Sequence, residues 1–277
     1  DCRWCAVYSY LEHGRYSARV DYLCQVAAET RHFKDEWKQA HIRYFQIAGI
    51  TIQVVMDQPV TENTFEQKFQ KFQVDSAGAD TVSIRFSSPA PKGSEIRLGK
   101  EMYRKAPLAI YRQGSAWVYL GIRTDEEQSV DSRVLAIFDE GYNHGTIFRN
   151  PDHNTAAPLN ALTAFPSDQV IFAQFLADRQ ACYLHASGFV LDGKGFLFVG
   201  HSEAGKSTMI KMLRGKGEIL CDDRIIVRRW PDGFHIHGTW SHGELPDVSP
   251  TGAPLHAILY LEKAPTNELV PLLDRRD

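Results

Sequence analysis

A glycine-rich stretch after an apolar run constrains the fold of this chain more than any other feature. The stretch consists of Gly200, His201, Ser202, Glu203, Ala204, Gly205, Lys206, Ser207 and Thr208. It matches G-x-x-x-x-G-K-[ST], the phosphate-binding P-loop motif. The preceding run, Gly195-Phe196-Leu197-Phe198-Val199, is typical of a short buried strand, and the apolar residues of 209–213 have helical spacing. The sequence therefore predicts a strand, a glycine-rich turn and a helix in that order.

The residue types of this stretch indicate its chemistry. Glycines allow the backbone to approach an anion, and successive N–H groups at a helix N-terminus face it. Lys206 is expected to reach the β- and γ-phosphates, and the Ser207 hydroxyl to ligate a metal. We therefore expect residues 200–208 to bind ATP with Mg²⁺. The alternative is a glycine-rich strand-to-helix turn that binds no ligand.

Composition excludes several other classes of protein. The chain has 277 residues, 43% of them hydrophobic, and a formal net charge of -3, which gives no sign of nucleic-acid binding. No apolar run approaches the length of a membrane span, and no signal peptide opens the sequence. Five cysteines without a disulfide-like pattern favour a cytoplasmic protein. The sequence starts at Asp1 and stops after a strand-like run, so we expect a fragment truncated at both ends.

The pattern divides the chain into three parts. Residues 1–41 carry Cys2, Cys5 and Cys24, which are either ligands of an incomplete metal site or ordinary cysteines, and continue into a helix. Residues 42–160 form a β-rich domain of unknown role, with alternating strands and a hairpin at Gln113-Gly114-Ser115. Residues 161–277 form the P-loop domain, in which Ser167 or Asp168 can cap a first helix. The fold class is therefore mixed, α/β (α+β), with a β-rich N-terminal region.

The strand that follows the P-loop helix ends in two adjacent carboxylates, Asp222 and Asp223. Two neighbouring carboxylates repel each other, so a nearby cation explains them better than packing does. They are candidate Mg²⁺ ligands together with Ser207, and one of them is a candidate base. His185 precedes the P-loop near the end of a neighbouring strand and is a candidate for the same site. The alternatives are solvated turn aspartates and a structural histidine.

Three segments together resemble the C-terminal kinase domain of HPr kinase/phosphorylase. They are Leu184-His185-Ala186-Ser187-Gly188, the P-loop itself and Leu220-Cys221-Asp222-Asp223-Arg224. The resemblance implies a fold similar to ATP-dependent phosphoenolpyruvate carboxykinase. It also implies that Lys206 and Ser207 hold phosphates and Mg²⁺, that Asp222 is the base, that His185 tunes it, and that Asp223 supports the metal.

Three positions of the P-loop depart from the pattern of that family. His201 replaces an Asp, Glu203 a Gly, and Thr208 a Glu. The downstream segment tied to phosphorylase activity is not recognisable, so the resemblance implies a kinase without the reverse reaction. Residues 1–30 resemble the tail of the SPASM region of radical SAM proteins, which implies a link to peptide modification.

These observations predict a Mg·ATP-dependent kinase that phosphorylates a serine of a protein or peptide, as a monomer or a homo-oligomer. In this hypothesis, replacing Asp222 by Asn abolishes transfer and leaves ATP binding largely intact. Two further hypotheses stay open: a nucleotide-binding sensor without transfer, which the negative charge of Glu203 favours, and a small-molecule or carboxykinase-like enzyme.

Overall fold

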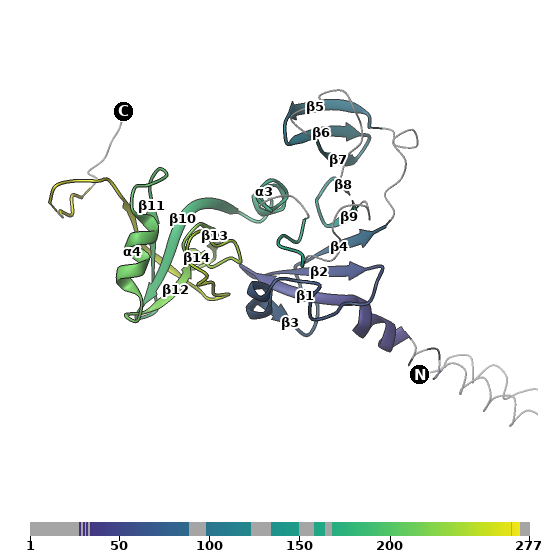
Figure 1. Ribbon diagram of the computed structural model, residues 1–277, viewed down its shortest axis with the longest axis horizontal. Helices are drawn as coiled ribbons and strands as arrows, with labels where there is room; N and C mark the ends of the chain where they lie inside the picture. Colours follow the sequence, from purple (N-terminus) through teal and green to yellow (C-terminus); the bar gives the residue numbers. More distant parts are fainter. Residues whose placement is uncertain are drawn as a thin grey trace, which may run out of the picture.

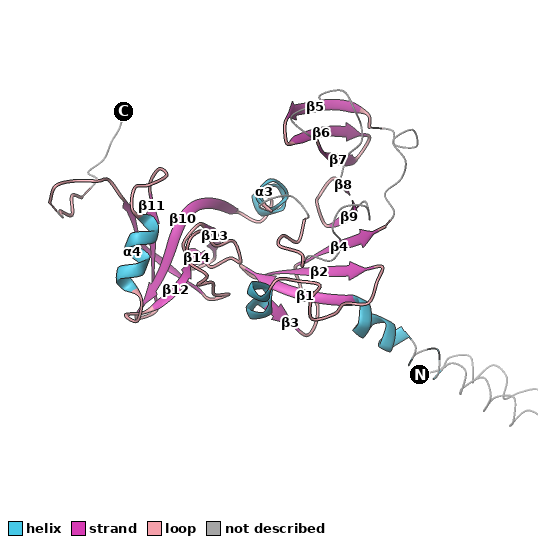
Figure 2. Ribbon diagram, in the orientation of Figure 1, coloured by secondary structure: helices cyan, strands magenta, loops and turns pink. Residues whose placement is uncertain are grey.

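The computed structural model of the chain describes residues 28, 30, 32, 34–88, 98–122, 134–149, 158–163, 168–266 and 268–271. Strands dominate this part of the chain, and a few short helices accompany them (Figure 2). The expected mixed α+β class and the β-rich region after residue 42 are therefore confirmed. Cys2, Cys5 and Cys24, for which the sequence leaves both a metal site and ordinary cysteines open, lie outside the described residues.

The first sheet has nine strands in the order β3-β1-β2-β4-β9-β8-β7-β6-β5 (Figure 1). The strands are β1 (Ile42–Ile47), β2 (Ile50–Met56), β3 (Gln73–Val74), β4 (Thr81–Ser87), β5 (Lys100–Lys105), β6 (Leu108–Gln113), β7 (Ala116–Gly121), β8 (Val134–Phe138) and β9 (His144–Arg149). Strand β4 is parallel to β2 and β9, and the other pairs are antiparallel. Strands β6 and β7 form the hairpin expected at residues 113–115.

The second sheet contains the strands of the predicted P-loop region. They are β10 (Ala181–Leu191), β11 (Lys194–Val199), β12 (Glu218–Cys221), β13 (Arg224–Trp230), β14 (Gly233–His237) and β15 (Gly252–Tyr260). The first half of β10 pairs with β13, and its second half pairs with β11 and β12. Because β11 also pairs with β15, which continues to β14 and β13, these strands close into a ring.

One hydrophobic core connects the two sheets. The short 3-10 helix η1 (Gln67–Phe72) packs on β1, and helix α3 (Gln169–Ala177) lies between the sheets (Figure 1). The Trp240 ring contacts the rings of Phe69, Phe72 and Phe172. Burial of such aromatic side chains contributes roughly 2–3 kcal/mol each. The strands of the two sheets fall on either side of the predicted boundary at 160/161, whereas the core continues across it.

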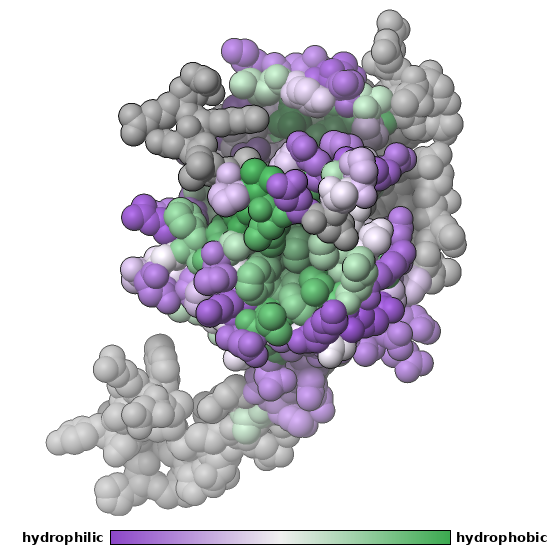
Figure 3. Space-filling model, turned by 90° about the vertical axis from the view of Figure 1, so that its left-hand side faces the viewer, coloured by the Kyte–Doolittle hydropathy of each residue, from purple (hydrophilic) through white to green (hydrophobic). Residues whose placement is uncertain are grey.

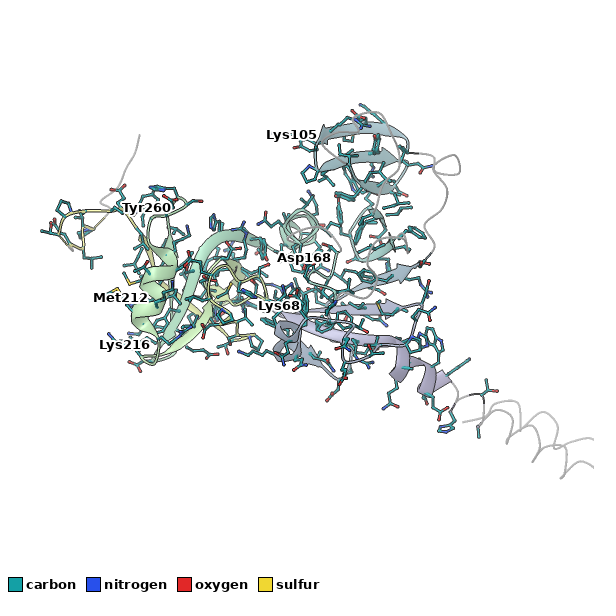
Figure 4. The ribbon with its side chains drawn as sticks, in the orientation of Figure 1. Lys68, Lys105, Asp168, Met212, Lys216 and Tyr260 are labelled. Atoms are coloured by element: carbon teal, nitrogen blue, oxygen red, sulfur yellow. The ribbon has the colours of Figure 1, made fainter. Side chains whose placement is uncertain are left out.

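Asp168 does not act as the helix cap that the sequence suggests. It occupies the N-cap position of α3 with a φ of 54°, but its side chain makes no capping hydrogen bond. The buried carboxylate instead accepts hydrogen bonds from Leu162 N, from both Thr163 N and Oγ1, and from Trp240 Nε1. Asp168, which Figure 4 labels, therefore connects residues 162–163, helix α3 and the loop after β14. The alternative cap, Ser167, lies outside the described residues.

The described part of the chain holds no helix with the length and apolar character that crossing a bilayer requires.

Candidate functional site

The glycine-rich stretch connects β11 to helix α4 (Lys206–Leu213), in the order expected from the sequence. A Cβ at Gly200 would lie 2.9 Å from Ala204 Cβ and 3.0 Å from Leu261 O, so the turn closes tightly against the end of β15. Gly205 has a φ of 108°, a left-handed conformation that a residue with a Cβ rarely adopts. The two motif glycines are therefore needed for the shape of this turn.

Lys206 folds back over the loop that precedes it. Its side chain is buried, and Nζ donates to Gly200 O at 2.9 Å and to His201 O at 3.0 Å. Within the described residues, the N–H groups of Lys206, Ser207 and Thr208 donate to no protein acceptor. Unpaired N–H groups at a helix N-terminus with an ammonium beside them are suited to a phosphate group. The residues present therefore fit the terminal phosphates of a nucleotide.

Glu203 is strained and exposed at the tip of this loop. Its φ of 68° lies in the left-handed region, which costs a residue with a Cβ about 1–2 kcal/mol. The exposed carboxylate adds a negative charge to a loop that otherwise suits an anion. Both observations favour glycine at this position, and the chain has glutamate there.

His185, Asp223 and Arg224 form a charged cluster at the junction of β10 and β13. His185 Nε2 lies 3.4 Å from Asp223 Oδ1, and Arg224 Nη1 lies 3.1 Å from the same oxygen. Burial, followed by the charges of Arg224 and Lys206, lowers the pKa of His185, and Asp223 opposes this shift only in part. The imidazole is therefore neutral near pH 7 and can accept a hydrogen bond or a proton. Ala186 pairs with Val199, so His185 and Gly200 are the next residues of β10 and β11 at the same end of this strand pair, and Gly200 O accepts from Lys206 Nζ.

Asp222 has a different environment from its neighbour. It is 2% exposed, and Oδ1 accepts a hydrogen bond from Gly243 N at 2.7 Å while Oδ2 accepts one from Leu245 N at 3.1 Å. Its own carbonyl accepts from Ser187 Oγ at 2.9 Å. The side chain that the sequence assigned to proton transfer thus holds the loop between β14 and β15. Of the two adjacent carboxylates, Asp223 is the accessible one, with 30% of its side chain exposed.

The loop between β14 and β15 is a part of the site that sequence reasoning missed. Trp240 anchors its first half through Asp168, and Tyr183 donates from its hydroxyl to Ser241 Oγ at 2.9 Å. Lys211 Nζ lies 3.0 Å from Glu244 Oε2, which connects the loop to α4. The one signal in the sequence was a tryptophan in a stretch rich in glycine, proline and serine.

A metal ion would bind at this site only together with the phosphates of a nucleotide, because the described side chains alone provide too few ligands. No group of three or more His, Cys, Asp or Glu side chains in the described part of the chain could hold a metal ion by itself. The Ser207 hydroxyl makes no hydrogen bond to another described residue. Mg²⁺ typically takes one or two protein oxygens together with phosphate oxygens and waters. Ser207 and Asp223 fit such a partial ligand set better than Asp222, whose oxygens are already engaged.

Comparison with known proteins gives one family match. Residues 160–276 match the sequence model of the SynChlorMet cassette protein ScmC. No curated protein matches the chain. The matched segment contains α3, the whole second sheet, the glycine-rich turn and the His185–Asp223 cluster.

This match corrects the family suggested by the sequence motifs. The model that matches is that of ScmC and not one of HPr kinases or of P-loop proteins, so the assignment to the HPr kinase/phosphorylase family is wrong. The match begins at residue 160 and does not support the SPASM resemblance of residues 1–30 either. The resemblance rested on a glycine-rich turn, a histidine and an aspartate pair, which together cover few positions of the segment. The match to ScmC extends over residues 160–276.

Proposed function

We propose that the chain binds Mg·ATP at the turn between β11 and α4 and phosphorylates a serine of a protein or peptide. One observation supports transfer beyond binding: His185 and the accessible Asp223 lie 3.4 Å apart at the strand end beside Gly200, whose carbonyl accepts from the loop lysine. A module that only binds a nucleotide needs the glycine-rich turn but no acid–base pair next to it.

Binding would rest on the backbone and on two side chains. The N–H groups of Lys206, Ser207 and Thr208 donate to phosphate oxygens, and the Lys206 ammonium exchanges the Gly200 and His201 carbonyls for the terminal phosphate. The Ser207 hydroxyl offers an oxygen ligand to Mg²⁺, whose other ligands would be phosphate oxygens and waters. When bound, Mg·ATP supplies the phosphoryl group and the ion that offsets its charge.

The cluster of His185, Asp223 and Arg224 would accept the proton that the seryl hydroxyl loses during transfer. In this proposal an Asp223 carboxylate oxygen accepts the proton of the seryl hydroxyl as the seryl oxygen attacks the γ-phosphorus of ATP and ADP leaves with the bridging oxygen. Neutral His185 orients the carboxylate through Nε2. Arg224 Nη1 donates to the same oxygen, Asp223 Oδ1, and no described side chain donates a hydrogen bond to Oδ2. Asp222 takes no part in the proton transfer and instead holds the loop that borders the site.

Calorimetric titration of Mg·ATP into the wild-type chain and two lysine variants tests the binding step. Lys206→Ala should lose binding, because the ammonium at the turn is removed. Lys216→Ala removes the same charge from an exposed residue beyond the other end of α4 and should bind as the wild type does (Figure 4). Equal affinity of all three proteins would overturn the proposed nucleotide site.

Labelled ATP then tests the transfer step. Asp223→Asn should bind Mg·ATP and transfer no label to serine-containing peptides, whereas the wild-type chain transfers it. Binding without transfer in the wild type would instead favour a nucleotide sensor, which the charge of Glu203 suits. Label on a metabolite and on no peptide would indicate a small-molecule kinase.

A further inference from the structure

The outer edge of β15 is the candidate binding surface that the proposed function does not explain. In the described residues β15 pairs with β14 only from Gly252 to Pro254, and with β11 as far as Tyr260. Leu261 N donates to Val199 O at 2.8 Å, so the backbone groups of alternate residues in this stretch face β11. The backbone N–H and C=O groups of Ile258 and Tyr260 therefore point away from β11. They face an edge that no described strand pairs with.

The stretch from Ala257 to Leu261 lacks the features by which proteins protect unpaired strands, although an irregularity precedes it, where the register of β15 against β11 shifts between Leu255 and Ala257. Proteins protect such edges with charged side chains, prolines or bulges. Pro254 stands where the pairing with β14 stops, and residues 255–261 contain no Lys, Arg, Asp or Glu. Ile258 and Tyr260 are 58% and 54% exposed on the same face of the strand. Figure 3 looks onto the end of the molecule that carries α4, β11 and β15, and apolar side chains gather in the middle of this face.

The edge leads directly to the proposed nucleotide site. The end of β15 touches the glycine-rich turn, because a Cβ at Gly200 would lie 3.0 Å from Leu261 O. Neighbouring strands lie about 4.8 Å apart, so a strand added to β15 would run about 10 Å from β11. A chain that leaves this edge beside Leu261 needs only two to four extended residues, at about 3.3 Å each, to reach the phosphate position.

We propose that this edge binds the peptide substrate as an added β-strand. The occupant is an uncharged, extended segment rich in β-branched and aromatic residues, and its acceptor serine follows the paired residues at the end beside Leu261. Backbone pairing with Ile258 and Tyr260 supplies affinity, and their exposed side chains contact every second residue of the peptide. The part of this proposal that concerns the acceptor serine rests on the proposed function.

Fluorescence anisotropy without ATP tests the docking surface by itself. The probe is a labelled library of short peptides in which one serine follows degenerate positions limited to Val, Ile, Thr and Tyr. A matched library of Asp, Lys and Gly at those positions is the control. The first library should bind the wild-type chain and the second should not. Failure of both to bind would overturn the proposal, whatever the result with ATP.

Two measurements show whether the bound peptide is a strand on this edge. Ile258→Pro removes an N–H that faces away from β11, so it should weaken binding about tenfold while Mg·ATP binding stays unchanged. Ile258→Thr keeps the N–H and should bind more tightly than the proline variant. Methylating the peptide nitrogens one at a time should weaken binding at every second residue, a result that does not depend on the folding of any variant. If methylation weakened peptide binding at consecutive residues and not at every second one, the proposed strand geometry would be wrong.

Other occupants of the edge give different results. If a second copy of the chain filled it, sedimentation would show a dimer that Ile258→Pro dissociates. If the chain itself covered it, the N–H groups of Ile258 and Tyr260 would be protected from hydrogen exchange before any peptide is added. Either result would overturn the proposal. If peptides bind with the expected alternation but no label is transferred, the docking surface stands and the proposed kinase function fails.

Discussion

Replacing Asp222 by Asn changes the buried carboxylate that holds Gly243 and Leu245 in the loop between β14 and β15. In the native protein each carboxylate oxygen accepts one backbone hydrogen bond, from Gly243 N and from Leu245 N. An asparagine keeps one acceptor oxygen and presents an NH₂ group to the other backbone N–H. One of the two bonds is therefore lost, and a buried donor faces another donor.

The size of the effect follows from these contacts. A hydrogen bond to a charged group contributes about 1.5–3 kcal/mol, and an unsatisfied buried donor costs about 1–3 kcal/mol. Because the loop can relax in part, we expect Asp222→Asn to lower the free energy of unfolding by about 3 kcal/mol. A loss of this size is large for a domain whose total stability is about 5–15 kcal/mol.

Urea unfolding measures this loss, and the neighbouring carboxylate provides the control. Asp223→Asn removes the same charge from a side chain that is 30% exposed and has only ion-pair partners. Partly exposed ion pairs contribute about 0–1 kcal/mol, so this variant should unfold close to the wild-type urea concentration. The slope of the unfolding free energy with urea should be the same in all three proteins.

We expect the order of the two variants in phosphoryl transfer to be the reverse of their order in stability loss. Asp223→Asn should retain stability and lose phosphoryl transfer, and Asp222→Asn should lose stability and keep transfer in the fraction that remains folded. Equal stability of Asp222→Asn and the wild type would refute the structural role of Asp222. Full transfer by Asp223→Asn would refute its proposed role as the base.

Three further predictions concern the surroundings of the site. Glu203→Gln keeps the strained backbone and removes the charge, so calorimetry should show tighter Mg·ATP binding, and weaker binding would contradict the geometry of the loop. Burial, followed by the charges of His235 and Arg228, lowers the pKa of His237 to about 4. As the pH falls, His237 is therefore protonated in the unfolded chain before it is protonated in the folded one. About 3 kcal/mol of stability that is present above pH 6.5 should be lost between pH 6.5 and 4. His237→Gln should largely remove this pH-dependent loss. Trp240→Phe leaves the buried Asp168 without one of its donors and should lower the urea midpoint by an amount equivalent to about 2 kcal/mol, whereas an unchanged midpoint would contradict the role of this pair in joining the two sheets.

Local features of the fold could be read from the sequence because their physical causes are local. The turn at Asp192 and Gly193 between β10 and β11 needs two left-handed residues, which Asp and Gly adopt readily, and both have positive φ. The strand before Gly200 and the helix after Gly205 follow from short apolar patterns. The alternation of strands after residue 42 likewise follows from a pattern with a period of two residues.

Features that depend on distant partners could not be read in this way. Asp168 has the residue type and the position of a helix cap, but Thr163 and Trp240 provide its buried carboxylate with better donors. The motif alone could not tell Asp222 from Asp223. Only the approach of the loop at Gly243 buries the first and leaves the second beside His185.

The sequence by itself determined the strand, turn and helix around Gly200, the hairpins, and the residue types available for phosphate binding, because backbone conformation and short-range periodicity specify them. The tertiary structure decided which carboxylate is accessible, how the Trp240 loop joins the two sheets, and which edge of β15 stays open. These properties depend on burial and on hydrogen-bond partners from segments far apart in the chain, and neither is encoded in any single stretch of residues.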